Sequence, residues 1–231
     1  MKLFVVATPI GNLKDITLRA LEVLRDVHII VAEDTRVTKK LLSRYEIQKP
    51  LIGFHEHSSR GTLNHIINLL REEKDLAYVV DAGTPGVADP ASFLVREVSA
   101  QIPETDIIPI PGPSALAAAV SIAGIRGDQF LFLGFPPHKK GRASFFKDVL
   151  DAKYPVVLYE SPHRILKTLK ELSDVGLSMF DAVLIKEISK VYEKIIRKSI
   201  VEILSDLKKE KSIKGEFVLV INKNSHSKRN T

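Results

Sequence analysis

The sequence predicts an α/β protein of two domains, and three observations predict it. Short apolar runs alternate with helix-like stretches along the first half, as in layers of helices on a sheet. Two apolar runs of the second half are too close for a helix to lie between them, which indicates a different sheet. Proline and glycine cluster between the halves, at residues 109–115. We therefore expect an N-terminal α/β domain at 1–112 and a C-terminal one at 113–223, with a basic disordered tail at 224–231.

Five apolar runs predict the strands of the first domain. They lie at residues 3–7, 28–33, 50–54, 76–81 and 106–111. None alternates cleanly between apolar and polar residues, which favours a mostly parallel sheet covered on both faces. Apolar side chains recur at helical spacing between the runs, most clearly at Leu63, Ile66, Ile67 and Leu70.

The second domain is expected to contain a mixed sheet. A helix of small residues is predicted at 114–124. Apolar runs follow it at 129–135, 155–161, 181–188, 193–200 and 215–222. Only a few residues separate the run at 181–188 from the run at 193–200, too few for a parallel crossover. These two runs therefore predict an antiparallel hairpin.

Composition excludes several classes of protein. The chain has 231 residues, of which 45% are hydrophobic and 27% charged, so a disordered or fibrous chain is excluded. No apolar run approaches the ~18 residues of a membrane span. Cysteine is absent, which excludes disulfides, thiolate metal sites and a cysteine nucleophile, and fits a reducing cytoplasm. The net charge of +6 permits a polyanionic partner without demanding one.

Three unusual loops follow predicted strands, where open α/β sheets bind their ligands. They are ATPIGN at 7–12, DAGTPGVADP at 81–90 and PGPSA at 111–115. Gly83 and Gly86 would let a ligand approach the backbone closely. The spacing matches neither a GxGxxG fingerprint nor a P-loop. Each loop also has a plain structural interpretation, as a turn or a helix cap.

Polar clusters end two other strands. AEDTR at 32–36 and YESPHR at 159–164 combine carboxylates with arginine, which suits acid–base chemistry or a substrate clamp, and equally a helix cap with a salt bridge. HKKGR at 138–142 is a basic loop, either solvated or in contact with phosphates. His55 and His57 lie two residues apart, but no third ligand stands out, so we expect no metal.

Seven motifs then identify a resemblance. They are, in order, ATPIGNLKDIT, VAEDTRVTKKLL, DAGTPGVADP, PGPSALAAA, FLGFPPHKKGR, YESPHR and GEFVLVIN. From Phe4 to about Ile221 the sequence resembles the ribosomal RNA small subunit methyltransferase I family, a branch of the tetrapyrrole methylase superfamily. The resemblance implies two α/β domains of the tetrapyrrole methylase type, with S-adenosylmethionine in a cleft between them. It also implies methylation of a cytidine ribose 2′-hydroxyl in the decoding region of small-subunit (16S) ribosomal RNA, by a cytoplasmic homodimer.

The resemblance assigns roles residue by residue. The implied donor-binding residues are Asp81, Ala82, Gly83, Thr84, Gly86, Ser114, Ala115 and Tyr159. The implied substrate-binding residues are Asn12, Arg36, Arg164 and Lys190. A ribose hydroxyl attacks only as its proton leaves, so a general base is expected, with Glu33, Asp34, Glu160 and His163 as candidates. Ala88 departs from the family, which commonly has serine there.

The choice among acceptors and among bases stays open at the level of sequence. One alternative is a methyltransferase of the same fold that acts on a tetrapyrrole or another small molecule. Another is a non-catalytic module that binds RNA and no methyl donor. The glycine loop at 81–90 argues against the second alternative, and the polar clusters at 32–36 and 159–164 argue against the first.

Overall fold

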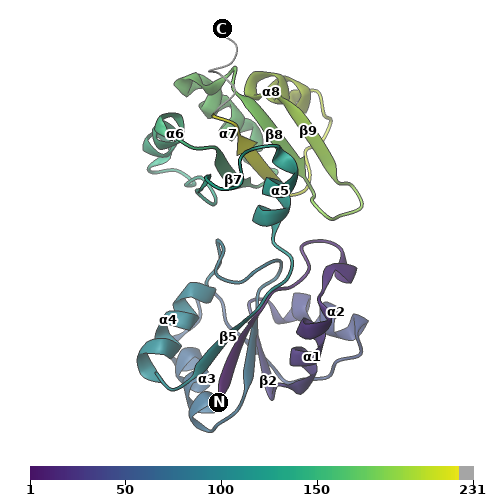
Figure 1. Cartoon of the computed structure of the whole chain (residues 1–231), viewed down its shortest axis with the longest axis vertical. Helices are drawn as coiled ribbons and strands as arrows, with labels where there is room; N and C mark the ends of the chain where they lie inside the picture. The colour runs from purple at the N-terminus through teal and green to yellow at the C-terminus, as the bar shows by residue number, and fades with distance from the viewer. Residues whose placement is uncertain (224–231) are drawn as a thin grey trace. The chain divides into compact units, whose positions relative to one another are not determined.

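The chain folds as two compact α/β units in the computed structural model, which describes residues 1–223 (Figure 1). The first unit ends at Ser114 and the second begins at Ala115. Each contains one five-stranded sheet, parallel in the first unit and mixed in the second. The predicted fold class is therefore confirmed. The tail expected at 224–231 lies outside the described residues.

Strands and helices alternate along the first unit. Its elements are β1 (Lys2–Val6), a short 3-10 helix η1 (Leu13–Asp15), α1 (Leu18–Asp26), β2 (Ile29–Ala32), α2 (Thr35–Arg44), β3 (Leu51–Gly53), α3 (Arg60–Arg71), β4 (Leu76–Val79), α4 (Ala91–Gln101) and β5 (Asp106–Ile110). The strands lie in the order β3-β2-β4-β1-β5, and all neighbours run parallel. All five carboxyl ends therefore meet at one edge of the sheet.

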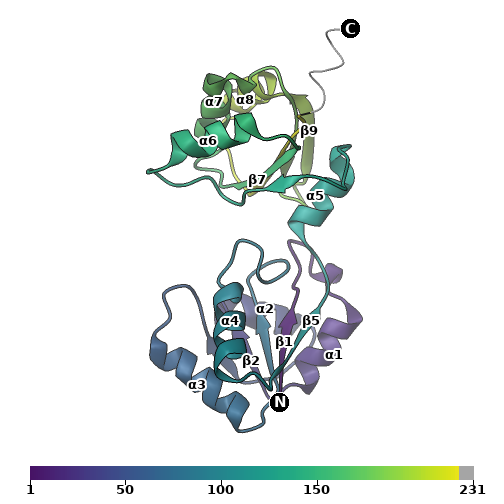
Figure 2. The ribbon, with the colours of Figure 1, turned by 60° about the vertical axis from the view of Figure 1, so that its left-hand side comes forward.

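Helices cover both faces of this sheet (Figure 2). Leu24 of α1 and Leu41 of α2 belong to the core on one face. Ile66 of α3 and Leu94 of α4 belong to the core on the other. The chain leaves β1 toward β2 on one side and leaves β4 toward β5 on the other, although β1 and β4 are neighbours. The loops after β1 and β4 therefore flank the switch point, where sheets of this kind bind ligands.

Side-chain caps begin three helices of the first unit. Thr17, Asp34 and Ser59 accept backbone N–H groups from the first turns of α1, α2 and α3. Such caps satisfy donors that a helix start leaves unpaired, and each is worth about 1 kcal/mol. Asp34, a candidate base, thus has a structural task. Within residues 1–223, every helix is too short or too polar to cross a bilayer.

Up to residue 223, the second unit begins with a helix and ends with a strand. Its elements are α5 (Ala115–Ala123), β6 (Leu131–Phe132), α6 (Arg142–Asp151), β7 (Val156–Glu160), α7 (Ile165–Leu172), a π-helical turn η2 (Ser173–Leu177), β8 (Asp181–Lys186), β9 (Lys194–Ser199), α8 (Ile200–Lys208) and β10 (Phe217–Ile221). The strand order is β6-β7-β10-β8-β9. β8 and β9 pair antiparallel, so the predicted hairpin is confirmed.

The sheet of the second unit lies between α5 and the other three helices (Figure 2). Phe146 of α6, Leu169 of α7 and Ile203 of α8 pack in one core. Ala119 of α5 packs with Val157 on the opposite face. β9 is an outer strand that pairs only with β8 among the described strands. Its second edge faces away from the sheet.

Candidate active site

Three loops at the carboxyl edge of the first sheet are bonded to one another. The backbones of Thr8 and Gly83 exchange two hydrogen bonds, with N···O distances of 2.9 and 3.0 Å. The hydroxyl of Thr8 is buried and donates to the carbonyl of Val80 at 3.0 Å. The hydroxyl of Thr84 donates to the carbonyl of Pro113, also at 3.0 Å. The loops after β1, β4 and β5 therefore form one rigid surface.

Glycine is required where these loops approach each other. Gly83 has a φ of +88°, and a Cβ there would lie 3.3 Å from Cγ2 of Ile10. A Cβ on Gly112 would lie 3.0 Å from the Cβ of Ala7. Gly86 has a φ of +91°, but an added Cβ would meet no described atom within 4 Å. The loop thus combines close backbone packing with open space beside Gly86.

Asp89 organises the loop after β4 from within. Its carboxylate accepts the backbone N–H groups of Gly86 at 2.8 Å, Val87 at 3.1 Å and Ala91 at 2.8 Å. Ala88, between them, adopts a left-handed φ of +63°. Three backbone donors of the loop are therefore occupied by a side chain of the same loop.

An acidic cluster lies where β2 and β4 end. The backbone N–H of Asp34 donates to Asp81 at 3.1 Å, and the backbone N–H of Asp81 donates to Glu33 at 3.3 Å. Burial raises the pKa of Glu33, and the negative charges of Asp81 and Asp89 raise it further. Burial also raises the pKa of Asp81. A carboxylate whose pKa moves toward neutrality is a stronger base, and Glu33 is the one of these two that is also a candidate base.

Asp34, unlike Glu33, has a lowered pKa because it pairs with an arginine. Its carboxylate takes two guanidinium nitrogens of Arg36, at 3.0 and 2.6 Å. These hydrogen bonds hold the pKa of Asp34 well below its ordinary range. The side chain of Arg36 is 87% exposed. An open pocket of about 450 Å³ adjoins this pair, and its lining comprises Glu33, Asp34, Thr35, Arg36, Gly53 and His55.

Glu160, at the end of β7 in the second unit, is fully buried. Its carboxylate accepts the backbone N–H of Ser161 at 2.7 Å and the hydroxyl of Thr168 at 2.6 Å. Arg164 pairs with it at 2.8 Å. His163 lies in the turn that follows and is exposed. These contacts engage both oxygens of Glu160 and favour a structural role for it.

A buried arginine extends this network. Arg142 donates to Glu171 at 3.0 Å, to the carbonyl of Pro137 at 2.6 Å and to the hydroxyl of Thr168 at 3.0 Å. Arg164 donates to the carbonyl of Pro136 at 2.9 Å. Both arginines therefore fix the Pro136–Pro137 segment. The hydroxyl of Thr168 accepts from Arg142 and donates to Glu160, which links the two ion pairs into one network.

Removing that hydroxyl is expected to destabilise the protein. Thr168→Val keeps the shape but leaves Glu160 and Arg142 each one hydrogen bond short, which should cost about 2 kcal/mol of unfolding free energy in urea. The matched control is Thr105→Val, because Oγ1 of Thr105 is buried without a hydrogen-bond partner among residues 1–223. That control should be neutral or stabilising. Equal losses in the two variants would contradict a shared network.

Tyr159 belongs to a cluster of three aromatic rings. Its ring meets Phe132 at a centroid distance of 4.9 Å and Phe135 at 5.5 Å, both edge to face. Burial raises the pKa of Tyr159 to about 12, although a hydrogen bond with the Leu116 backbone lowers it in part. The phenol is therefore neutral at physiological pH. This group offers aromatic contacts to a planar base.

The other predicted binding residues lie at separate places. Lys190, between β8 and β9, pairs with Glu187 at 2.9 Å and Glu216 at 3.0 Å. Burial lowers the pKa of Lys190, but these two hydrogen bonds outweigh burial and raise it. Asn12 accepts the backbone N–H of Lys14 and so caps η1. Ser114 precedes the first residue of α5, Ala115.

Within each unit, the structure thus brings one set of predicted residues together. The first-unit set is Glu33, Asp34, Arg36, Asp81, Ala82, Gly83, Thr84 and Gly86. The second-unit set is Tyr159, Glu160, His163 and Arg164. Sequence reasoning assigned no role to Thr8, Asp89, Arg142 or Thr168. Asp89 carried a signal, because an aspartate in a turn rich in glycine and proline commonly accepts the backbone N–H two residues on, here that of Ala91. Among residues 1–223, no group of three or more His, Asp or Glu side chains is placed to hold a metal ion.

Comparisons with known proteins match most of the chain. A family model described as tetrapyrrole (corrin/porphyrin) methylases matches residues 2–204. The chain is 41% identical over 220 residues to a protein of Thermotoga maritima named ribosomal RNA small subunit methyltransferase I, covering 95% of this chain and 97% of that one. It is 38% identical to the protein of the same name from Bacillus subtilis, covering 95% of this chain and 74% of that one.

Solved structures share the fold at lower identity. The uroporphyrin-III-C-methyltransferase of Thermus thermophilus superposes with a TM-score of 0.68 at 18% identity, over 96% of this chain and 94% of that one. A diphthine synthase superposes with a TM-score of 0.68 at 20% identity, over 95% and 88% of the two chains. These likenesses concern the fold alone, since their identities are low.

Proposed function

The chain belongs to the tetrapyrrole methylase family and, within it, to the ribosomal RNA small subunit methyltransferase I proteins, and from this premise we propose that it methylates small-subunit ribosomal RNA with S-adenosylmethionine as donor. The observation that carries the proposal is the 41% identity to the Thermotoga maritima protein over nearly the full length of both chains. The tetrapyrrole methyltransferase of the same fold is only 18% identical. RNA is therefore the acceptor we favour over a tetrapyrrole.

The acceptor atom we propose is the ribose 2′-hydroxyl of a cytidine in 16S RNA. The resemblance of the seven sequence motifs supports this finer assignment. The acidic cluster supports it too, because a ribose hydroxyl needs a base, whereas an aromatic base nitrogen with a lone pair does not. The homodimer and the cytoplasmic location, which the same resemblance implies, stay predictions.

The first-unit loops fit the donor that the family uses. The open space beside Gly86 admits a ligand against the backbone, and the carboxylates of Glu33 and Asp81 suit a cation. We propose that Asp81, Gly83, Thr84 and Gly86 hold the donor. When bound, S-adenosylmethionine supplies an activated methyl group on its sulfonium sulfur. The loops then have to align the acceptor oxygen with that methyl group and exclude water.

Glu33 is the general base in this proposal. Its pKa is raised, its carboxylate borders the pocket at the end of β2, and one backbone N–H fixes it. Asp34 is less suited, because its pair with Arg36 depresses its pKa and a weak base takes up protons poorly. Glu160 is buried among its own partners. Glu33 would accept the hydroxyl proton as the oxygen attacks the methyl carbon. Arg36 remains exposed for a phosphodiester.

The test is the position of the transferred methyl group. Small ribosomal subunits that lack modifications are incubated with the protein and isotopically labelled donor, and the RNA is digested to nucleosides for mass spectrometry. We expect the label on the ribose of cytidine. Replacing that cytidine by its 2′-deoxy form in an RNA oligonucleotide should abolish labelling. Label on a base would refute the ribose assignment, and label on a tetrapyrrole acceptor alone would refute the RNA assignment.

A separate measurement addresses the non-catalytic alternative. Calorimetric titration with S-adenosylmethionine should show saturable binding with one donor per chain. A module that only binds RNA would give no heat of donor binding and no methyl transfer.

A further inference from the structure

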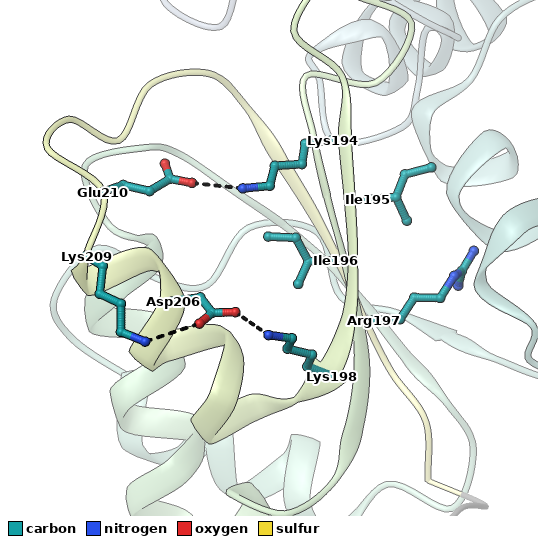
Figure 3. Close-up of a pocket in the computed structure, with 8 residues that line it drawn as sticks. All are labelled: Lys194, Ile195, Ile196, Arg197, Lys198, Asp206, Lys209 and Glu210. Atoms are coloured by element: carbon teal, nitrogen blue, oxygen red, sulfur yellow. Dashed lines mark hydrogen bonds and ion pairs between the residues drawn. The ribbon is translucent and has the colours of Figure 1, made fainter.

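A basic surface lies on the outer strand of the second sheet, apart from the residues assigned above. Figure 3 shows it between β9 and the end of α8. The surface encloses a pocket of about 460 Å³, whose lining comprises Lys194, Ile195, Ile196, Arg197, Lys198, Asp206, Lys209 and Glu210. Four of these side chains are cationic and two are acidic. The lining therefore has a formal charge excess of two.

Each of the two carboxylates on this surface forms ion pairs with two lysines. Asp206 is shared by Lys198 at 2.6 Å and Lys209 at 3.6 Å. Glu210 is shared by Lys194 at 3.4 Å and a further lysine, Lys186, at 3.1 Å. Each carboxylate can neutralise only one of its two ammonium groups. The arrangement thus fixes the lysines in place and leaves positive charge for another anion.

The lysines on the strand are available to a partner. In Figure 3, Lys194 and Lys198 point to the α8 side of β9, while Arg197 points to the other side. Their ion pairs are partly exposed, and exposed pairs are worth less than about 1 kcal/mol, so exchange for a phosphate is cheap. Four residues of an antiparallel strand span about 13 Å, so the two lysines can contact different phosphates of one chain.

An exposed aromatic ring adjoins the lysines. Tyr192, two residues before Lys194 in the loop from β8, has 79% of its surface exposed. Val191 beside it is 92% exposed. A solvent-exposed tyrosine next to cationic side chains is the combination with which proteins hold single-stranded RNA, because the ring stacks on an unpaired base while cations meet the backbone.

We propose that Tyr192, Lys194, Lys198 and Lys209 form a binding surface for single-stranded ribosomal RNA, separate from the methyl-donor loops. The inference rests on the proposed function for its choice of partner. Phosphates would displace Asp206 and Glu210 as partners of the strand lysines, and one unpaired base would stack on Tyr192.

The double variant Lys194→Gln/Lys198→Gln tests the phosphate contacts. Asp206 keeps Lys209 and Glu210 keeps Lys186, so neither carboxylate is left unpaired. Affinity for a single-stranded RNA of the decoding-region sequence should fall about tenfold. The slope of log affinity against log salt should shrink by about 1.4, since single strands lose about 0.7 per phosphate contact. Lys147→Gln/Lys167→Gln is the matched control, because it removes equal charge from exposed positions of α6 and α7.

Two single variants separate stacking from charge. Tyr192→Ala should lower the affinity for the same RNA about tenfold without changing the salt slope. Tyr192→Phe, which keeps the ring, should bind this RNA with the wild-type affinity. Asp206→Asn releases two lysines from their shared carboxylate and should strengthen binding about threefold. A gain of affinity cannot arise from misfolding, so this variant tests the surface even where the double variant folds poorly.

The outcomes distinguish this inference from the proposed function. If all these variants keep the wild-type RNA affinity and salt slope, and methylation is intact, the inference alone is overturned. The lysines would then serve only as charges that keep an outer strand from pairing with another strand. Absence of both RNA binding and RNA methylation in the wild-type protein would overturn the proposed function as well. Weakening equal to that of the Lys147→Gln/Lys167→Gln control would also overturn the inference, because it would reflect net charge.

Discussion

Glu33→Gln is expected to lower kcat/KM for RNA methylation about 100-fold or more, the contribution typical of a general base. Glutamine can still accept the backbone N–H of Asp81, so the loop is retained while the proton acceptor is lost. The measurement is the initial rate with labelled donor and small ribosomal subunits. Donor affinity by calorimetry should fall far less than kcat/KM, because the lost charge only weakens the attraction for the sulfonium while the main defect lies in proton transfer.

The same substitution should not destabilise the protein. Burial raises the folded-state pKa of Glu33 above its ordinary value of 4.5, so the charged carboxylate disfavours the folded state at neutral pH. That penalty fades as pH falls through the raised pKa, and Glu33→Gln removes it at every pH. The urea midpoint at pH 7 is therefore expected to stay or to rise. In the wild-type enzyme, kcat/KM should decline on the acid side with an apparent pKa above 4.5.

Comparator variants decide between the carboxylates. Asp34→Asn should cost less than tenfold in rate, because Asp34 caps α2 and pairs with Arg36. Glu22→Gln, at an exposed position of α1, should leave the rate unchanged. A Glu33→Gln enzyme within threefold of wild type, with a large loss in Asp34→Asn or His163→Ala, would transfer the role of base to one of those residues.

The second large effect concerns the donor. Gly83→Ala should weaken S-adenosylmethionine binding about 100-fold, which corresponds to about 2.8 kcal/mol. The new Cβ would lie 3.3 Å from Cγ2 of Ile10, so the Ile10 side chain in the loop after β1 has to shift, and it would be in van der Waals contact with the carbonyl of Pro113 at 3.9 Å. A left-handed φ for alanine adds about 1 kcal/mol of strain. Calorimetric titration measures the affinity, and urea unfolding measures the strain separately.

Gly141→Ala is the control for strain alone. Gly141 has a φ of +85°, close to the +88° of Gly83, but its added Cβ meets no described atom within 4 Å. We expect a similar loss of stability and unchanged donor affinity. Unchanged affinity in Gly83→Ala as well would remove this loop from the donor site.

Local patterns in the sequence predicted the fold well. The strand that ends at Val79 is buried along its whole length, and its unbroken apolar run predicted a sheet covered on both faces. The short loop between Lys186 and Lys194 predicted the antiparallel hairpin, because chain length alone forbids a crossover. Such features are determined by residues that are close in sequence, so the sequence alone is enough to predict them.

The contacts that define the site are long-range and were not predictable. Glu33 and Asp34 are adjacent and alike in sequence, yet burial raises the pKa of Glu33 while hydrogen bonds from Arg36 lower that of Asp34. Glu160 was a candidate base, but its partner Thr168 lies a turn of helix beyond the motif that suggested it. Pairing across 75 residues, as between Thr8 and Gly83, leaves no local signal.

The hydrogen bonds of Asp89 within the loop after β4 bear on which adenosine compounds the proposed donor site would bind. Glycine-rich turns elsewhere use their backbone N–H groups to cradle phosphate, but here the amides of Gly86, Val87 and Ala91 already serve an internal anion. A nucleoside triphosphate would meet the negative charges of Asp81 and Glu33 in place of vacant amides. We therefore expect the proposed donor site to bind a positively charged adenosine derivative in preference to ATP.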